Sequence, residues 1–222
     1  MTTELVVLDL AGTTVADDGL VVRAFTAAIG AAGVSEEDSR FAGMLAHVHA
    51  TMGQSKITVF RSLLPTEDLA QRANAEFERA YGVLVAAGEC KPLPGAEEVI
   101  RGLRHAGVKV ALTTGFAVAT QQAILGALGW RGLADLALAP GDGLRGRPYP
   151  DLVLAAVLRL GVTDVRHVAV AGDTPADMRT GLAAGARVVA GVLTGAGTGA
   201  ELREAGATHV LGSVRDLPDV LD

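Results

Sequence analysis

Chemically versatile side chains follow the apolar runs of this 222-residue chain at four points. Asp9 closes the first run, Thr114 and Gly115 follow the second, Arg147 lies beyond the third, and Asp173 follows the fourth. If these runs are strands of one parallel sheet, their carboxyl ends share an edge, which is where ligands bind in such sheets. We therefore expect carboxylates, hydroxyl groups, free loop amides and one guanidinium to meet at a single site.

This set of groups suits phosphoryl transfer. An aspartate such as Asp9 can attack phosphorus and form a covalent intermediate, and Mg²⁺ needs hard oxygen ligands such as Asp9 and Asp173. Thr114 and Arg147 can hold the phosphoryl oxygens. Each residue also has a simpler explanation, since a strand-end aspartate usually caps a turn and a single loop arginine is usually solvated. Their joint order along one chain favours the functional interpretation.

The apolar runs that carry these groups are rich in β-branched residues, which predicts strands buried on both faces. The runs span residues 5–10, 108–112, 133–138, 167–171 and 187–192. Helical periodicity occupies residues 96–105, 118–128, 149–160 and 177–184. Strand alternating with helix predicts an α/β fold in which helices cover both faces of a parallel sheet.

One long segment breaks this alternation. Residues 16–92 show helical periodicity and no convincing strand. The polar residues 16–19 lead into this segment, and the stiff Pro-Leu-Pro-Gly of residues 92–95 leads out of it. We therefore expect an α/β core formed by residues 1–15 and 93–222, with an α-helical cap inserted between them.

The composition limits the kinds of ligand. Lys and Arg number 19 against 25 Asp and Glu, a formal net charge of −6, and no basic run occurs. This argues against nucleic acid or an anionic membrane as the partner, and no apolar run approaches the roughly 18 residues of a membrane span. The single Cys90 excludes a disulfide framework, and acidic Glu4 and Asp9 do not fit a secretory signal. We expect a cytoplasmic protein with a small-molecule ligand.

The first motif of the site resembles that of a known family. Residues 9–13 read Asp-Leu-Ala-Gly-Thr. With the groups beyond the other strands, they resemble the haloacid dehalogenase superfamily of aspartate-nucleophile hydrolases over essentially the whole chain. The resemblance implies a Rossmann-like core with a helical cap. It also implies a Mg²⁺ site at Asp9, Ala11, Asp173 and Asp177, and substrate contacts at Ala11, Gly12 and Thr13.

Two departures from the superfamily pattern narrow the resemblance. The usual motif is Asp-x-Asp-x-Thr, and in the common phosphatases its second acid protonates the leaving alcohol; here that position is Ala11. The usual lysine is replaced by Arg147, within Gly-Arg-Pro-Tyr-Pro. Both features are similar to the phosphonoacetaldehyde hydrolase, or phosphonatase, branch. There a C–P bond is broken, so no alcohol needs an acid.

A lysine in the expected cap adds to this resemblance. Residues 52–56 read Met-Gly-Gln-Ser-Lys and match the Met-Gly-x-x-Lys of that branch, whose lysine condenses with the substrate aldehyde. Lys56 would have to be neutral to do so, and burial under the cap beside Met52 should depress its pKa. The branch also places a histidine near the lysine, and the helix after Lys56 has none. Gly115 and Phe116 are further candidates for substrate contact.

The resemblance implies Mg²⁺-dependent hydrolysis of the C–P bond in phosphonoacetaldehyde or a related 2-oxoalkylphosphonate. Lys56 would form an imine and Asp9 an aspartyl-phosphate, with Thr114 and Arg147 assisting. Two alternatives stay open: a phosphatase that acts on a small phosphate monoester, and a catalytically silent phosphate-binding protein. A homodimer through the cap helices is also possible.

Three other signals predict no chemistry. Residues 195–200 approximate a dinucleotide-binding fingerprint, but we interpret them as a flexible turn away from the site. His47 and His49 lie two residues apart, so a helix would point them to different faces and a metal pair is not expected. Cys90 lacks a His or Asn partner and is interpreted as a packed thiol.

Overall fold

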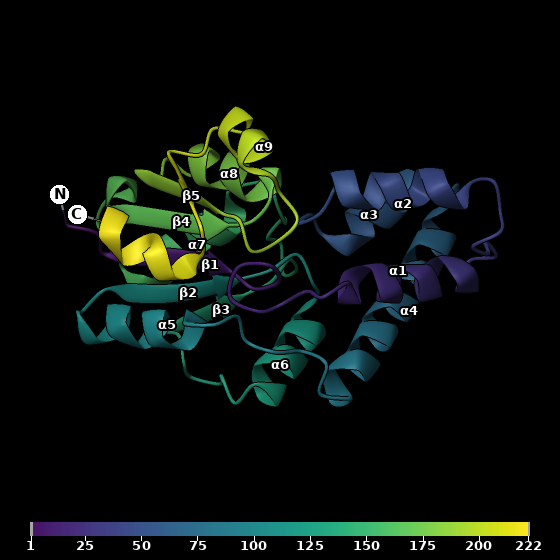
Figure 1. Ribbon diagram of the computed structural model, residues 1–222, viewed down its shortest axis with the longest axis horizontal. Helices are drawn as coiled ribbons and strands as arrows, with labels where there is room; N and C mark the ends of the chain where they lie inside the picture. Colours follow the sequence, from purple (N-terminus) through teal and green to yellow (C-terminus); the bar gives the residue numbers. More distant parts are fainter. Residues whose placement is uncertain (1, 222) are drawn as a thin grey trace.

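The computed structural model describes residues 2–221 and contains a six-stranded parallel sheet with the order β3-β2-β1-β4-β5-β6 (Figure 1). The strands are β1 Leu5–Asp9, β2 Lys109–Thr113, β3 Leu136–Leu138, β4 Val168–Gly172, β5 Val188–Val192 and β6 His209–Leu211. The predicted α/β fold is confirmed. The short strand β6 was not predicted, because its three partly exposed residues form no apolar run.

The helices before β2 are α1 Leu20–Ala31, α2 Phe41–Ala50, α3 Lys56–Leu63, α4 Glu67–Ala86 and α5 Ala96–His105. Those after β2 are α6 Val118–Ala127, α7 Asp151–Leu160, α8 Pro175–Ala183 and α9 Gly199–Glu204, with 3₁₀ helices η1 Val165–His167 and η2 Val214–Val220. No helix within residues 2–221 is long and apolar enough to cross a membrane.

The central strand β1 is buried on both faces, as its continuous apolar run predicts. Successive side chains of a strand point to opposite faces. Val6 and Leu8 belong to the core that contains the apolar residues of α5 and α6, whereas Leu5 and Val7 belong to a second core with those of α7. This sandwich holds the carboxyl end of β1 in a fixed position.

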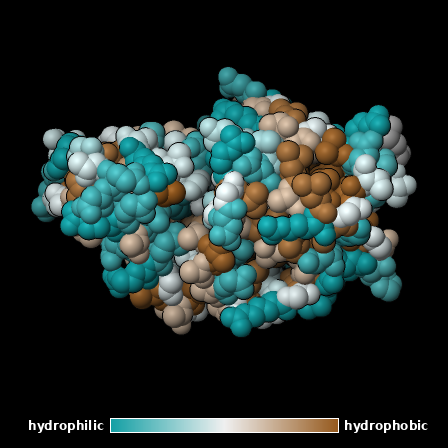
Figure 2. Space-filling view, turned by 180° about the vertical axis from the view of Figure 1, so that it is seen from behind, coloured by the Kyte–Doolittle hydropathy of each residue, from teal (hydrophilic) through white to brown (hydrophobic). Residues whose placement is uncertain are grey.

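Helices α1 to α4, here called the cap helices, lie together on one side of the sheet (Figure 1). The chain leaves the core and returns to it at one place, where Val15 pairs with Pro92. From behind, the cap side is mainly hydrophilic, whereas hydrophobic residues gather on the half that holds the sheet (Figure 2). The division into a core of residues 1–15 and 93–222 and a cap of residues 16–92 stays a prediction.

A row of aromatic rings joins the cap helices to the core. Phe25 stacks on Phe60 with ring centroids 5.9 Å apart, and Phe60 meets Phe77 edge-on at 6.1 Å. Phe77 and Tyr81 then contact Phe116, which follows β2, at 6.1 and 4.5 Å. Each aromatic pair contributes about 0.5–1.5 kcal/mol beyond the burial of its surface. The row therefore ties the cap helices to a loop at the carboxyl edge of the sheet.

Helix α4 also caps a helix of the core. The first turn of α6 has no side-chain cap of its own. Glu78 of α4 accepts a hydrogen bond from the backbone N–H of Ala117 at 3.3 Å and another from the hydroxyl of Thr120. A carboxylate is favoured at a helix N-terminus because free N–H groups point toward it.

Candidate active site

Asp9 is the last residue of β1, and a tight turn of residues 10–15 follows it. The carbonyl oxygen of Leu10 accepts hydrogen bonds from the amides of Thr13, Thr14 and Val15, and the amide of Gly12 donates to Val15. The free loop amides expected at the site are therefore not those of residues 12–14. The turn satisfies its own N–H groups, because a buried unpaired N–H is costly.

Asp173 follows β4 and lies beside Asp9 at the same edge of the sheet. Its Oδ1 accepts a 3.3 Å hydrogen bond from the Thr13 hydroxyl, and its Oδ2 accepts one of 2.7 Å from the backbone N–H of Ala196. A Cβ on Gly12 would lie 2.4 Å from Oδ2 of Asp173. Gly12 and Thr13 thus hold Asp173, and neither lines the cavity described below.

The segment after β5 also belongs to the site. The amide of Gly197 donates to the carbonyl oxygen of Asp173 at 2.9 Å. The hydroxyl of Thr194 donates to the carbonyl oxygen of Gly12 at 2.7 Å. A Cβ on Gly195 would lie only 2.0 Å from Asp173 Oδ2. The interpretation of residues 195–200 as a turn away from the chemistry is wrong, because β5 lies beside β4 in the sheet.

Arg147 lies at the centre of the polar contacts. Its guanidinium contacts Asp9 Oδ1 at 2.6 Å and Asp177 Oδ1 at 2.7 Å. It also donates to the hydroxyl of Thr113 at 2.9 Å and to the carbonyl oxygen of Gly53 at 3.3 Å. Arg147 is only 5% exposed. A single guanidinium thus joins the ends of β1 and β2 and the first turn of α8 to the segment that precedes α3.

Three buried carboxylates, Asp9, Asp173 and Asp177, surround this one guanidinium. Burial raises the pKa of Asp9, and Arg147 opposes that rise. Burial also raises the pKa of Asp173, and the charge of Asp9 raises it further. Negative charge therefore exceeds positive charge at this edge of the sheet, and a divalent cation would offset the excess.

The donor atoms fit Mg²⁺ at some of the predicted positions. Arg147 is paired with Oδ1 of Asp9 rather than Oδ2, the carbonyl oxygen of Ala11 accepts no hydrogen bond from the described residues, and Asp173 lies beside them. Residues 2–221 contain no group of three His, Cys, Asp or Glu side chains arranged to hold a metal. This agrees with Mg²⁺, which proteins bind through one or two carboxylates together with water and substrate oxygens.

Asp177 pairs with Arg147 and caps helix α8. Its Oδ1 is paired with Arg147, and its Oδ2 accepts hydrogen bonds from the amide and the hydroxyl of Thr174 at 3.1 and 2.5 Å. These contacts form a capping box at the start of α8. Both oxygens therefore have partners on this chain, and contact of Asp177 with a metal, direct or through water, stays a prediction.

Lys56 opens α3 and is 9% exposed. Its Nζ lies 5.4 Å from the ring centroid of Phe116 and 5.8 Å from that of Phe77, and it forms no ion pair or hydrogen bond with the described residues. Burial lowers the pKa of Lys56, while the charges of Asp17 and Asp9 oppose that change. This environment favours the neutral amine.

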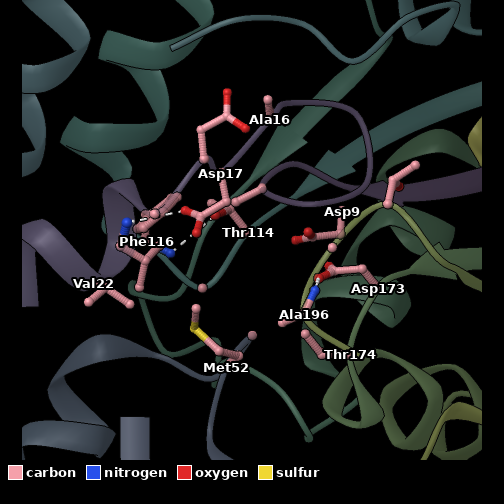
Figure 3. Close-up of a pocket in the computed structure, with 18 of the residues that line it drawn as sticks. Asp9, Ala16, Asp17, Val22, Met52, Thr114, Phe116, Asp173, Thr174 and Ala196 are labelled. Atoms are coloured by element: carbon pink, nitrogen blue, oxygen red, sulfur yellow. Dashed lines mark hydrogen bonds between the residues drawn. The ribbon is translucent and has the colours of Figure 1, made fainter. Parts of the chain in front are cut away.

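A cavity of about 350 Å³ connects these groups. Asp9 and Asp173 lie on one side of it, and Phe116, Val22 and Met52 lie across from them (Figure 3). Nine of the predicted site residues line it: Asp9, Ala11, Met52, Lys56, Thr114, Gly115, Phe116, Arg147 and Asp173. Gly12, Thr13 and Asp177 lie behind this lining. The roles of all these residues stay predictions.

Sequence reasoning missed Asp17, Thr194, Gly195 and Ala196, which also line the cavity. Residues 194–196 follow an apolar run, and the rule that ligands bind beyond strand ends applies to them equally. No comparable signal marks Asp17, which resembles an ordinary residue of a polar linker.

The remaining predictions concern His47, His49 and Cys90. His47 is hydrogen-bonded to Ser62 at 2.8 Å, whereas His49 is exposed at the margin of the cavity, so they form no metal pair. Cys90 is buried and free, and burial raises the pKa of its thiol to about 11. Its interpretation as a packed thiol is confirmed.

Comparisons with known proteins agree with this geometry. The family model of haloacid dehalogenase-like hydrolases matches residues 3–185. Phosphonoacetaldehyde hydrolase of Bacillus cereus is 34% identical over 208 residues, which cover 88% of this chain and 77% of that protein.

Solved structures show the same likeness. A phosphonoacetaldehyde hydrolase-like protein from Oleispira antarctica superposes with a TM-score of 0.85 at 25% identity, covering 100% of this chain and 92% of the other. A putative phosphoglycolate phosphatase from Lactobacillus delbrueckii has a TM-score of 0.81 at 20% identity, with 100% and 99% of the two chains covered, and shares the fold. The chain therefore belongs to the haloacid dehalogenase-like hydrolases and is related to phosphonoacetaldehyde hydrolase.

Proposed function

We propose that this hydrolase cleaves the C–P bond of phosphonoacetaldehyde or a related 2-oxoalkylphosphonate through an imine at Lys56. The observation that carries the proposal is a buried lysine without an anionic partner among residues 2–221, in the cavity that holds Asp9. A buried ammonium normally pairs with a carboxylate. A lysine surrounded by aromatic rings instead is suited to act as a nucleophilic amine.

The reaction begins when Nζ of Lys56 attacks the substrate carbonyl carbon and water leaves, which forms an iminium. An oxygen of Asp9 then attacks phosphorus and the C–P bond breaks. Its electron pair moves into the iminium and yields an enamine. Water hydrolyses the aspartyl-phosphate to phosphate, and protonation and hydrolysis of the enamine release the aldehyde and restore Lys56.

The polar side of the cavity performs the phosphoryl half of this reaction. Arg147 fixes one oxygen of Asp9 and leaves the other free to attack. The hydroxyl of Thr114 lines the cavity and is a hydrogen-bond donor for the phosphonate. Asp9, Asp173 and the carbonyl of Ala11 would hold Mg²⁺. When bound, the cation would reduce the repulsion between the carboxylate and an anionic substrate.

Ala11 supports the proposal because its side chain carries no acidic group. A phosphatase needs an acid for the leaving alcohol, and alanine cannot supply a proton. In C–P cleavage the electrons flow into the iminium, so this position needs no acid. The relationship to phosphonoacetaldehyde hydrolase of Bacillus cereus points in the same direction.

The test is borohydride trapping combined with Lys56→Arg. With phosphonoacetaldehyde and Mg²⁺, borohydride should reduce the imine, and peptide mass analysis should locate the product at Lys56. Lys56→Arg keeps the charge but cannot form an imine, so phosphate release should fall on the order of 10⁴-fold or more. Lys91→Arg, at an exposed lysine in the returning linker, is the matched control and should be silent.

Two results would overturn the proposal. One is normal phosphonate hydrolysis by a folded Lys56→Arg protein, with folding checked by its melting temperature. The other is the absence of any trapped lysine in an enzyme that is turning over. Faster hydrolysis of phosphate monoesters than of any phosphonate would favour the phosphatase alternative.

A further inference from the structure

Imine formation requires a group that moves protons, and this inference rests on the proposed function. The lysine must lose a proton before it attacks, and the carbinolamine oxygen must gain one before it leaves as water. No histidine lies on α3, where Lys56 is located. Another acid or base must therefore face the amine from elsewhere in the cavity.

Asp17 has the required position. It lies on the segment between β1 and α1, is partly buried and lines the same cavity as Lys56. Its Oδ1 accepts a 3.2 Å hydrogen bond from the backbone N–H of Val21, which orients the carboxylate. A backbone hydrogen bond from Gly19 acts on the same carboxylate. Asp17 and Lys56 form no ion pair with each other, and both side chains face the cavity in which the substrate would lie.

The other titratable groups around Lys56 are either bonded to other residues or exposed to solvent. Asp9 is paired with Arg147 and is the proposed nucleophile. Both oxygens of Glu78 accept hydrogen bonds at the start of α6. His49 reaches the margin of the cavity but is exposed.

The electrostatics of the two side chains support proton exchange between them. Burial lowers the pKa of Lys56, and Asp17 is the strongest of the charges that oppose this. Burial also raises the pKa of Asp17, against which the hydrogen bond from Val21 and the charge of Lys56 act, while Asp18 adds to the rise. The two pKa values move toward each other, so a neutral amine beside a neutral carboxylic acid becomes accessible.

We propose that Asp17 is the acid–base group of imine formation at Lys56. Asp17 takes a proton from the Lys56 ammonium, and the free amine attacks the carbonyl carbon. A proton passes from nitrogen to oxygen and gives the neutral carbinolamine. Protonated Asp17 then donates its proton to the carbinolamine hydroxyl, the C–O bond breaks, and water leaves. The products are the iminium, water and the Asp17 carboxylate.

The test compares Asp17→Asn with Asp219→Asn. The amide oxygen that Asp17→Asn introduces can still accept the hydrogen bond from Val21, so the fold should be retained. Asp219→Asn removes the same charge at an exposed residue of η2 that does not line the cavity and is not among the charges acting on Lys56 or Asp17. Both variants are mixed with phosphonoacetaldehyde and Mg²⁺, and the rate of borohydride trapping at Lys56 is measured against pH.

For Asp17→Asn we expect trapping and turnover to fall by about 10²–10⁴-fold, the range of general acid–base catalysis. The pH dependence contributed by Asp17 should disappear, and Asp17→Glu should restore part of the rate, whereas Asp219→Asn should stay within about twofold of the wild type. A loss of fold would affect the melting temperature, whereas a loss of the catalytic group would not.

Trapping by Asp17→Asn at the wild-type rate and with the wild-type pH profile would overturn this inference while leaving the imine mechanism intact. A larger loss in His49→Gln than in Asp17→Asn would overturn it in the same way. If borohydride traps no lysine in the wild type, the proposed function is wrong and this inference is wrong with it.

Discussion

The two sides of the cavity differ in whether their buried charged groups have partners. On the phosphoryl side, Asp9 and Asp177 share one buried guanidinium, and Asp173 is held by the backbone amide of Ala196. On the amine side, Lys56 contacts the rings of Phe77 and Phe116 and has no ion-pair partner in residues 2–221. In the first arrangement Arg147 opposes the rise that burial causes in the pKa of Asp9, whereas in the second burial lowers the pKa of Lys56 and favours its neutral form.

This difference follows from the cost of burying a charge. A buried carboxylate is stable when a cation or several hydrogen bonds compensate it. Without compensation the pKa of the group moves until the group becomes neutral. One cavity can therefore contain an anionic nucleophile and an uncharged amine at the same pH.

The change with the largest expected effect is Asp9→Asn, which removes the nucleophile from the phosphoryl side. Turnover should fall by about 10⁴-fold or more. Stability should stay equal or rise, because one of three clustered negative charges is lost. Acid quenching with ³²P-labelled substrate should leave label on the wild type and none on the variant. Label on Asp9→Asn would assign the nucleophile to another residue.

The next largest effect is expected for Arg147→Lys, which keeps the charge and removes the planar contacts. A lysine cannot contact Asp9, Asp177 and Thr113 together. We expect kcat to fall by about 10²-fold, since small displacements of reacting groups have effects of this size. Arg145→Lys, at an exposed arginine paired with Asp151, is the control. Equal activity of the two variants would mean that Arg147 is not needed to position Asp9.

The dependence of activity on Mg²⁺ should distinguish the roles of Asp173 and Asp177. Chelation should abolish activity and added Mg²⁺ should restore it. Asp173→Asn should raise the Mg²⁺ concentration for half-maximal activity by about 10 to 100-fold. Asp177→Asn should lower kcat through Arg147 with a smaller change in Mg²⁺ dependence. Full activity in excess EDTA would exclude a metal-dependent mechanism.

The smallest effect is expected from Met52→Glu, which gives the amine side the carboxylate that it lacks. An opposite charge favours the protonated amine, so the pKa of Lys56 should rise. The limb of the pH–rate profile that reports loss of the lysine proton should then move to higher pH. The rate at neutral pH should fall about tenfold for every pH unit that this limb moves. Met52→Leu is the uncharged control and should leave the limb in place.

The sequence predicted the phosphoryl side well because its groups come from strand ends. Asp9, Asp173 and Arg147 each follow an apolar run, and a parallel sheet brings such positions together. The contact of Ala196 with Asp173 was missed because it depends on the position of β5 beside β4. Strand order in the sheet cannot be deduced from local patterns.

Two other errors have physical causes of a different kind. Free loop amides were expected at the site, but the turn after β1 uses the N–H groups of residues 12–14 internally, which depends on the φ of +88° at Gly12. Asp17 was overlooked because a linker aspartate is usually solvated. Only the packing of α1 and α3 brings it to the cavity of Lys56.

The close contact between the cap segment and the core has a consequence for evolution. Gly53 has a φ of +82°, and a Cβ there would lie 2.4 Å from the hydroxyl oxygen of Thr174. A side chain at residue 53 is therefore excluded unless residue 174 becomes smaller and the backbone strain is tolerated. Although 121 positions separate them in the sequence, the two residues should vary together among relatives, with a side chain at 53 appearing only beside alanine or glycine at 174.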